Sequence, residues 1–475
     1  MKQKYLEEED FALLKVSQKE QFPKKKRHIS LKSILKEIGF SKNHLYSIIA
    51  IFISFIAKEP CFINFNIFAP VFYKIYKKDN KSYFIPIISG IFFIGYIIGN
   101  LSVGRICEKI GRRKGCLFGI ICMFILSLIS VIDCNPYLFL ICRLLFGICF
   151  GIAVPQIFVN FFEIIPDEWY KSYIFFTIFI FERIGSVYFF LSYNFLSDEK
   201  GLGNWRFAYS LACFPLLLTL FFFYNFYHDS TNLLIQKGEI KKLVDSLNSM
   251  RISKNMEKLS KDEIEILKKE SEKINMQKES NDFSYLLLFS KEYYKKTILL
   301  TLIVAMADMS SYTNLYSSPI LFEKLGGESK NQIIELLKTQ LYPIFTIIIL
   351  IFYSKYFGKY ITILTGFVIC ALTSVFPVFS PTNFNTLVTS SIFINCFIIF
   401  SGCQTRILVI EEYPTKLRDI ALATIYAITK ITISLTPSTA SVLMDNYPNG
   451  AFIQIGGFCM IGMIAILLLS MEKHL

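Results

Sequence analysis

Charged side chains lie inside long apolar stretches of this sequence, where little water is available to solvate them. A charge held away from water costs several kcal/mol unless it is paired or hydrated, so each one is a candidate for binding a charged solute or carrying a proton. Arg143 lies nearer the end of its stretch than the others, and it could instead snorkel toward the membrane surface. We predict that six residues line an interior cavity: Glu59, Glu182, Asp308, Lys430, Arg143 and Arg406.

The same charges could form fixed ion pairs between helices and have no further role. Glu182 and Lys430 occupy equivalent depths in two different stretches, and we predict that they pair with each other until a substrate or a proton separates them. Neighbouring residues on a helix point about 100° apart. Therefore Lys58 and Glu59 cannot both face one cavity, and neither can Glu182 and Arg183.

The elements that must carry these charges are membrane-spanning helices. The chain has 475 residues, of which 53% are hydrophobic and only 18% are charged, so it holds more apolar surface than a soluble core can bury. Apolar runs of 18 or more residues can cross the hydrocarbon layer as helices. Twelve spans are predicted, near residues 45–72, 84–104, 115–132, 137–162, 171–195, 206–227, 297–322, 332–353, 360–380, 384–410, 419–444 and 450–471.

An internal repeat relates the first six spans to the last six. At an offset of 247 to 249 residues, Glu163-x-x-Pro166 falls on Glu411-x-x-Pro414, and Gly111-Arg112 falls on Gly358-Lys359. At the same offset Gln156 falls on Gln404, and Glu182 falls on Lys430. We therefore predict an all-α membrane protein of twelve transmembrane helices arranged as two pseudo-symmetric six-helix bundles, with a site at their interface near mid-membrane.

Cations concentrate on one side of the predicted spans, in the 105–114 loop and in residues 228–296, so we expect both termini to be cytoplasmic. The net charge of +13 then fits attraction to anionic lipid and needs no nucleic acid. The expected divisions are a cytoplasmic segment, two six-helix bundles separated by a linker with short amphipathic helices, and a cytoplasmic tail: 1–44, 45–227, 228–296, 297–471 and 472–475. An N-cap pattern at Ser260-Lys261-Asp262-Glu263 begins one linker helix.

The sequence lacks the residue patterns that metal binding, disulfide bonding and enzymatic catalysis require. The four histidines lie outside the spans or at their edges, and the twelve cysteines are scattered, so we expect neither a metal site nor a structural disulfide. No phosphate-binding Gly-x-x-x-x-Gly-Lys-Ser/Thr loop occurs, and no nucleophile is arranged with a base. We expect no enzyme activity and no cofactor, and a monomer in the bilayer.

The run Gly104-Arg105-Ile106-Cys107-Glu108-Lys109-Ile110-Gly111-Arg112-Arg113-Lys114 resembles the loop between helices two and three of the major facilitator superfamily, with Glu108 in place of the family Asp. Other segments are similar to its sugar-porter, organic-ion and synaptic-vesicle-glycoprotein group. They are Arg143-x-x-x-Gly147-x-x-x-Gly151, Glu163-x-x-Pro166, Glu411-Glu412-Tyr413-Pro414-Thr415-x-x-Arg418 and residues 229–238. The hexose-transporter Gln-Gln-x-x-Gly and Gly-Pro-x-x-Trp motifs are absent.

The resemblance implies the major facilitator fold and transport by alternating access. It also implies that loop charges hold helix ends together in one conformation, in a gating network of Glu108, Arg112, Arg113, Glu163, Glu411 and Arg418. Such hydrated pairs are individually weak, and they bias a two-state equilibrium.

Three functions remain open at this point. The interior charges favour a secondary active transporter of a small charged organic metabolite, with a proton as a candidate coupling ion. A facilitative transporter of sugars or other neutral solutes is the alternative within the same class. A transporter-like nutrient sensor that no longer cycles is the third. The sequence leaves the plasma membrane and an internal organelle membrane equally open as the site of residence.

Overall fold

The computed structural model describes residues 30–39, 41–69, 71–73, 83–132, 135–164, 168–196, 205–226, 231–280, 285–325, 329–413, 415–447 and 449–474. The chain divides into two compact units. One unit holds Asn43–Ser230 with Asp282–Leu475, and the other holds Met1–Lys42 with Thr231–Asn281. The first is a bundle of long apolar helices and the second is a small group of short polar ones.

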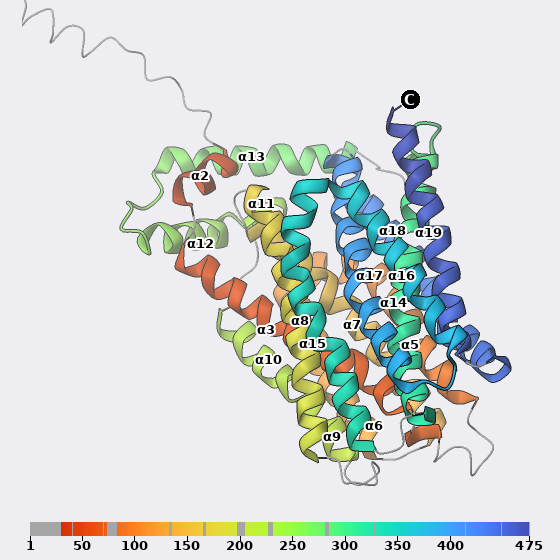
Figure 1. Cartoon of the computed structure of the whole chain (residues 1–475). Coiled ribbons are helices and arrows are strands. Elements are labelled where there is room, and N and C mark those ends of the chain that lie inside the picture. The colour runs from red at the N-terminus through yellow and green to blue at the C-terminus, as the bar shows by residue number, and fades with distance from the viewer. Residues whose placement is uncertain are drawn as a thin grey trace, which may run out of the picture. The chain divides into compact units, whose positions relative to one another are not determined.

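In the part of the chain that the structure describes, the helices of the bundle form twelve spans. Figure 1 shows their arrangement. The sixth is divided into α9 and α10 by a turn at Cys213, two residues before Pro215. The helices are α3 (Lys42–Ile67), α5 (Phe84–Ile110), α6 (Arg112–Ile132), α7 (Pro136–Ile164), α8 (Glu168–Leu196), α9 (Trp205–Ala212), α10 (Phe214–Phe226), α14 (Tyr294–Leu325), α15 (Ser329–Phe357), α16 (Lys359–Phe379), α17 (Phe384–Glu412), α18 (Thr415–Asn446) and α19 (Gly450–His474).

The predicted twelve-helix architecture is confirmed. Within the described residues, ten of the helices are long and apolar enough to cross a membrane. The other two, α8 and α18, have 29 and 32 residues, so they are long enough to span. They carry the interior charges Glu182, Arg183 and Lys430.

The internal repeat is visible in matched helix lengths. Both α6 and α16 have 21 residues, and both α7 and α17 have 29. The turns before α6 and α16 are also alike, because Gly111 and Gly358 adopt positive φ angles of 98° and 77°. Glycine takes up this conformation without a Cβ clash, which explains why the repeat keeps a glycine at both turns.

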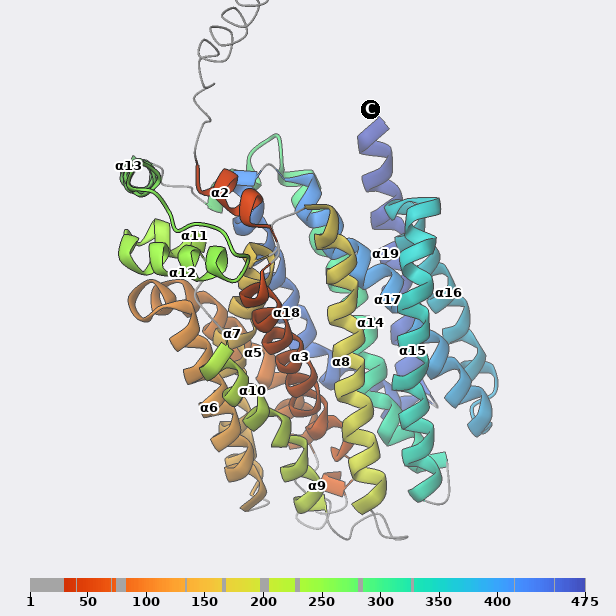
Figure 2. The ribbon, with the colours of Figure 1, turned by 90° about the vertical axis from the view of Figure 1, so that its left-hand side faces the viewer.

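Close packing of α5 against α7 depends on glycine. Along the α5–α7 crossing, a Cβ at Gly95, Gly99, Gly147 or Gly151 would collide with the backbone of the opposite helix, so the helices pack backbone to backbone. Across the two halves, α5 packs against α18 and α8 packs against α15. Figure 2 shows α8 and α15 side by side.

The smaller unit contains α2 (Leu31–Ile38), α11 (Thr231–Gln236), α12 (Ile240–Ile252) and α13 (Lys261–Ser280) around a core that includes Ile34, Leu243 and Leu267. The predicted capping box begins α13: Glu263 N–H donates to Ser260 Oγ at 3.2 Å, and Ser260 N–H donates to Glu263 Oε2 at 2.8 Å. The sequence prediction missed α2, which Ser30 caps in the same manner.

Arg251 joins α12 to α13 inside this unit. Its guanidinium donates to both carboxylate oxygens of Glu263, at 2.7 and 3.1 Å. Partial burial raises the pKa of Glu263, but the hydrogen bonds from Arg251 and Ser260 outweigh it and hold the pKa below its ordinary value.

Candidate functional site

The first half of the bundle contributes a charge group from α3 and α8. Nζ of Lys58 lies 2.7 Å from a carboxylate oxygen of Glu182 and 3.8 Å from one of Glu59. Both acids are buried. The ammonium group also lies over the rings of Phe55 and Phe150, at 5.5 and 5.9 Å from their centroids. Aromatic faces stabilise a cation in such a site but give nothing to an anion.

The backbone explains how α3 and α8 approach so closely at this depth. Pro60 has no N–H, so the carbonyl oxygen of Ile56 one turn earlier lacks its usual helical donor. Gly185 of α8 lies against that carbonyl, where any Cβ would collide with it. Because Gly185 follows Glu182 by about one turn, the close approach brings the Glu182 carboxylate to Lys58.

The second half contributes a charge group from α14, α17 and α18. Nζ of Lys430 donates to one oxygen of Asp308 at 3.0 Å, and a guanidinium nitrogen of Arg406 reaches the other at 3.5 Å. Asp308 therefore sits between two cations, and its side chain is only 10% exposed. Paired charges of this kind are tolerated at membrane depth.

The two groups face each other across the halves. Arg406 lies over the ring of Phe179 from the first half, 5.2 Å from its centroid, and Lys430 lies 5.9 Å from that of Phe93. Arg406 also interacts electrostatically with both Glu59 and Glu182. Five of the six predicted cavity residues thus belong to one charged cluster, which we call the interior cluster: Lys58, Glu59, Glu182, Arg183, Asp308, Arg406 and Lys430.

The predicted Glu182–Lys430 pair is wrong. Each residue takes a partner inside its own half, because Lys58 on α3 is closer to Glu182 and Asp308 on α14 is closer to Lys430. The sequence showed Lys58 beside Glu59 but not that it turns toward α8. Arg183, next to Glu182, instead makes a direct hydrogen bond across the halves, donating to Gln340 Oε1 at 2.7 Å.

Arg143, the sixth predicted residue, lies apart from these ion pairs. Its guanidinium donates to the backbone carbonyls of Cys61 and Phe62 at 3.2 and 2.8 Å, and it stacks on three phenylalanine rings. It is 4% exposed, so it does not snorkel to a membrane surface. Its contacts tie α7 to α3, just beyond Pro60.

The predicted gating network is described only in part. The side chains of Glu108, Arg112, Glu163 and Arg418 lie outside the described part of the chain. Glu411 forms an ion pair with Lys359, the repeat equivalent of Arg112. Arg113 donates to the backbone carbonyl of Tyr224 and lies over its ring. The gating role of the six residues stays a prediction.

Sequence reasoning missed a second set of contacts beside Glu411. Glu412 pairs with Lys296 at 3.0 Å and accepts a hydrogen bond from Tyr360 at 2.9 Å. These bonds join α14, α16 and α17, three helices of the same half. Glu411 and Glu412 stand out in the sequence as adjacent acids. Their partners lie on other helices, which only the fold places beside them.

An uncharged network joins the halves near the end of the bundle where α3 and α14 end. Asn66 donates to Tyr312 at 3.3 Å and accepts a hydrogen bond from Ser89 at 2.8 Å, and Tyr312 donates to the Ser89 carbonyl at 3.2 Å. Tyr73 and Tyr316 lie within 3.4 Å of each other, hydroxyl to hydroxyl. No signal in the sequence separates these polar residues from ordinary packing.

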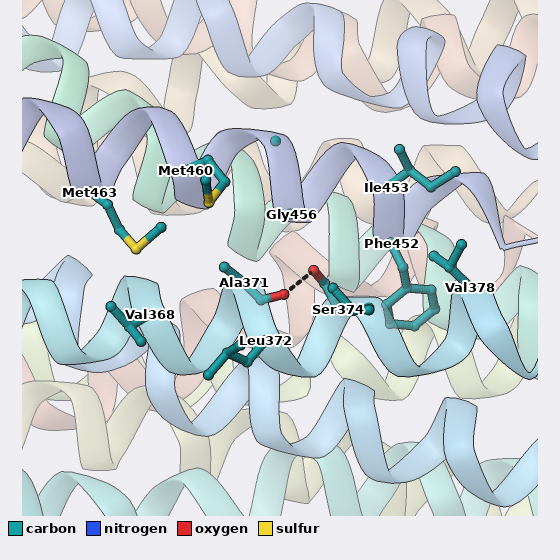
Figure 3. A pocket seen from close by; sticks show the side chains of 12 residues that line it. Val368, Ala371, Leu372, Ser374, Val378, Phe452, Ile453, Gly456, Met460 and Met463 are labelled. Atoms are coloured by element: carbon teal, nitrogen blue, oxygen red, sulfur yellow. Dashed lines mark hydrogen bonds between the residues drawn. The ribbon is translucent and has the colours of Figure 1, made fainter.

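A separate groove lies between α16 and α19, with a volume of about 420 Å³ (Figure 3). Its lining is apolar, with Val368, Leu372 and Phe452 among the residues, and its hydroxyl, on Ser374, is turned to the carbonyl of Ala371 at 2.8 Å. None of the interior cluster lines it. Among the described residues, no three His, Cys, Asp or Glu side chains gather as a metal-binding group.

Comparison with known proteins gives a consistent result. The family model "Sugar (and other) transporter" matches residues 53–473. A transporter-like protein of Caenorhabditis elegans, svop-1, is 27% identical over 403 residues, which cover 80% of this chain and 74% of the relative. Sugar transport protein 4 of Arabidopsis thaliana is 22% identical over 315 residues, covering 63% and 58% respectively.

Solved structures support the same fold. The xylose transporter XylE from E. coli, in a partially occluded inward-open conformation, superposes with a TM-score of 0.72 at 14% identity, covering 90% of this chain and 98% of that one. XylE bound to 6-bromo-6-deoxy-D-glucose gives a TM-score of 0.70 at 15% identity, with coverage of 89% and 95%. The solved structures show that the chain has the major facilitator fold. The family match shows that the chain is a transporter and not an enzyme, and that it belongs to the sugar (and other) transporter family.

Proposed function

We propose that this protein is a secondary active transporter that moves a small charged organic metabolite across a membrane by alternating access. The observation that carries this proposal is the interior cluster, in which both halves contribute ionisable side chains at mid-membrane depth. Ion pairs inside each half are enough to stabilise that half. A purely structural role therefore does not require the two charge groups to lie at the interface between the halves, which move relative to each other during transport. A charged solute bound there would contact both halves at once.

Glu59 is the proposed proton carrier. Protonation of Glu182 or Asp308 would break a short ion pair, at 2.7 or 3.0 Å. Protonation of Glu59 removes a charge whose closest described cation is 3.8 Å away. A proton can therefore bind and leave Glu59 without dismantling the ion pairs that hold the helices.

The hydrogen bonds between the halves support an alternating-access cycle. Those described lie beside the interior cluster, through Arg183 and Tyr312, and farther toward the end of α3, through the hydroxyls of Tyr73 and Tyr316. At the opposite end, the ion pairs of Glu411 and Glu412 join helices of one half only. With both termini in the cytoplasm, as we propose, this conformation is closed on the outside and opens inward. We further propose a monomer with the six-helix bundles 45–227 and 297–471.

Uptake into proteoliposomes tests the proposal. Purified protein is reconstituted with and without an imposed pH gradient, and accumulation of candidate charged metabolites is measured between pH 5 and 8. We expect accumulation above equilibrium only when the gradient is present. Uptake that is indifferent to the gradient over this range would exclude proton coupling.

Facilitated transport of a neutral sugar is the second candidate. The family description, XylE and sugar transport protein 4 favour a sugar as the solute, whereas XylE itself is a proton:xylose symporter and supports proton coupling. The two candidates differ in a simple readout, because a facilitator equilibrates its solute and never concentrates it. Labelled glucose and xylose in the same vesicles separate the candidates: equilibration of either sugar, with no uptake of charged metabolites, supports the facilitator.

A further inference from the structure

The interior cluster holds more cations than acids. Four side chains are positive, Lys58, Arg183, Arg406 and Lys430, and three are negative, Glu59, Glu182 and Asp308. The two lysines each have an acid at 3.0 Å or closer. The two arginines do not within the described residues, since Arg183 donates to the neutral amide of Gln340 and Arg406 reaches Asp308 only at 3.5 Å. The surplus charge is therefore on the arginines.

Arg406 is the less satisfied of the two. A guanidinium has five N–H donors, and within the described residues one of them makes a hydrogen bond, to an oxygen whose carboxylate Lys430 also binds. Its Nε is buried without a hydrogen-bond partner in that part of the chain. Its side chain is 25% exposed, more than Asp308 or Lys430 beside it. Part of the Arg406 side chain is therefore accessible, while its Nε is enclosed.

Aromatic rings hold the guanidinium in place without using its donors. Phe179 of α8 lies on one side, 5.2 Å away, and Tyr426 of α18 lies 6.0 Å away. Stacking fixes the plane of the guanidinium, and the planar fork matches an oxyanion with two oxygens. Phe179 and Arg406 come from opposite halves, so a ligand held by Arg406 lies where the halves meet.

We propose that the transported substrate is an organic anion whose oxyanion group, a carboxylate or a phosphate, binds to Arg406. This inference rests on the proposed transport function and adds the sign of the substrate charge. On binding, the anion displaces Asp308 from Arg406, while Asp308 keeps its shorter bond to Lys430. A cationic substrate is disfavoured, because it would add positive charge to a cluster that already has too much, and the least paired acid, Glu59, is beside Lys58.

The first test measures ligand class. The purified full chain is screened by thermal unfolding at constant ionic strength with carboxylates (lactate, succinate, benzoate), a phosphate ester (glycerol 3-phosphate), cations (choline, putrescine) and sugars (glucose, xylose). We expect at least one anion to stabilise the protein and to be taken up by proteoliposomes. The carboxylate and phosphate arms identify which oxyanion is preferred.

Two substitutions that should change the KM in opposite directions test whether Arg406 is the binding residue. Arg406→Gln should raise the KM for the anion by about tenfold to a hundredfold, the range of one to two charge-assisted hydrogen bonds. Asp308→Asn removes the carboxylate that competes with the anion for Arg406, so it should lower the KM. A fall in kcat does not affect this test. Misfolding cannot produce both changes. Arg206→Gln on α9, an exposed arginine bonded to the carbonyl of Val131, is the matched control and should leave the KM unchanged.

Transport of a cation or sugar with no response to any anion would overturn the inference and leave the transport function standing. An anion KM that is the same in Arg406→Gln and the parent protein would also overturn it. If no solute of any class is taken up or stabilises the protein, the proposed transport function fails, and the inference fails with it.

Discussion

Replacing Lys58 by alanine is expected to destabilise the bundle, because it leaves the Glu182 carboxylate without its ion partner in a nearly closed site. The two side chains are 14% and 10% exposed, and their charged atoms are 2.7 Å apart. At an effective dielectric constant of about 20, charges at this distance attract each other by about 6 kcal/mol before any dehydration cost. Dehydration offsets most of that gain, yet removing one partner alone still costs about 3 to 5 kcal/mol.

A double-mutant cycle isolates the pair. The free energy of unfolding is measured by denaturant titration in mixed micelles for Lys58→Ala, for Glu182→Ala and for the double variant. We expect the double variant to be more stable than the sum of the single effects predicts, by about 1 to 3 kcal/mol, because no unpaired charge remains. Lys430→Ala serves as the control, since its partner is Asp308.

Additive effects of Lys58→Ala and Glu182→Ala would refute this reasoning. A larger coupling energy between Glu182 and Lys430 than between Glu182 and Lys58 would refute it as well. That result would restore the pairing expected from the repeat and remove the basis for treating each half as a separately paired unit.

Three further predictions concern coupling, conformation and acid stability. Glu59→Gln should abolish the dependence of net uptake on a pH gradient but retain exchange of solute between the two sides, as counterflow in proteoliposomes would reveal. Asn66→Ala removes the hydrogen bond to Tyr312 across the halves, worth about 1 kcal/mol, so the outside-closed population should fall about fivefold relative to the open one. Labelling of an engineered cysteine from outside measures this change, and unchanged labelling would contradict it. Glu263 has a lowered pKa, so its contribution to stability is complete above its ordinary value of 4.5 and is lost as pH falls through the lower folded value. The hydrogen-exchange protection factor of α13, which corrects for the slower intrinsic exchange in acid, should therefore fall on acidification below pH 4.5 in the parent protein, and Glu263→Gln should already show the lower protection at pH 7.

Most of the fold could be predicted from the sequence because lipid imposes a simple requirement on it. An apolar run that crosses the bilayer must form a helix, because its backbone N–H and C=O groups have no water to bond. The predicted spans therefore agree closely with the helices. For example, 384–410 became Phe384–Glu412, and 137–162 became Pro136–Ile164. The short helix Leu31–Ile38 was missed because it lies in a polar segment and gains its stability from contacts with residues 231–280.

The sequence analysis named five of the seven residues of the interior cluster, but not the ion pairs that they form. A charge inside an apolar run can be recognised from the sequence alone, as with Glu59, Asp308 and Arg406. Which acid meets which base depends on helix rotation, and nothing in the sequence showed that Lys58 binds Glu182 on another helix. The network of Asn66 and Tyr312 stayed hidden because uncharged polar residues are common in spans that pack against other helices.

The most direct measurement is a cryo-electron microscopy structure of the protein in lipid nanodiscs, saturated with the solute that proteoliposome uptake identifies. We expect solute density between the two halves, in contact with Arg406 and near Asp308, Lys430 and Glu59. Density confined to the apolar groove between α16 and α19, or absent from the space between the halves, would contradict the claim that the interior cluster is the transport site.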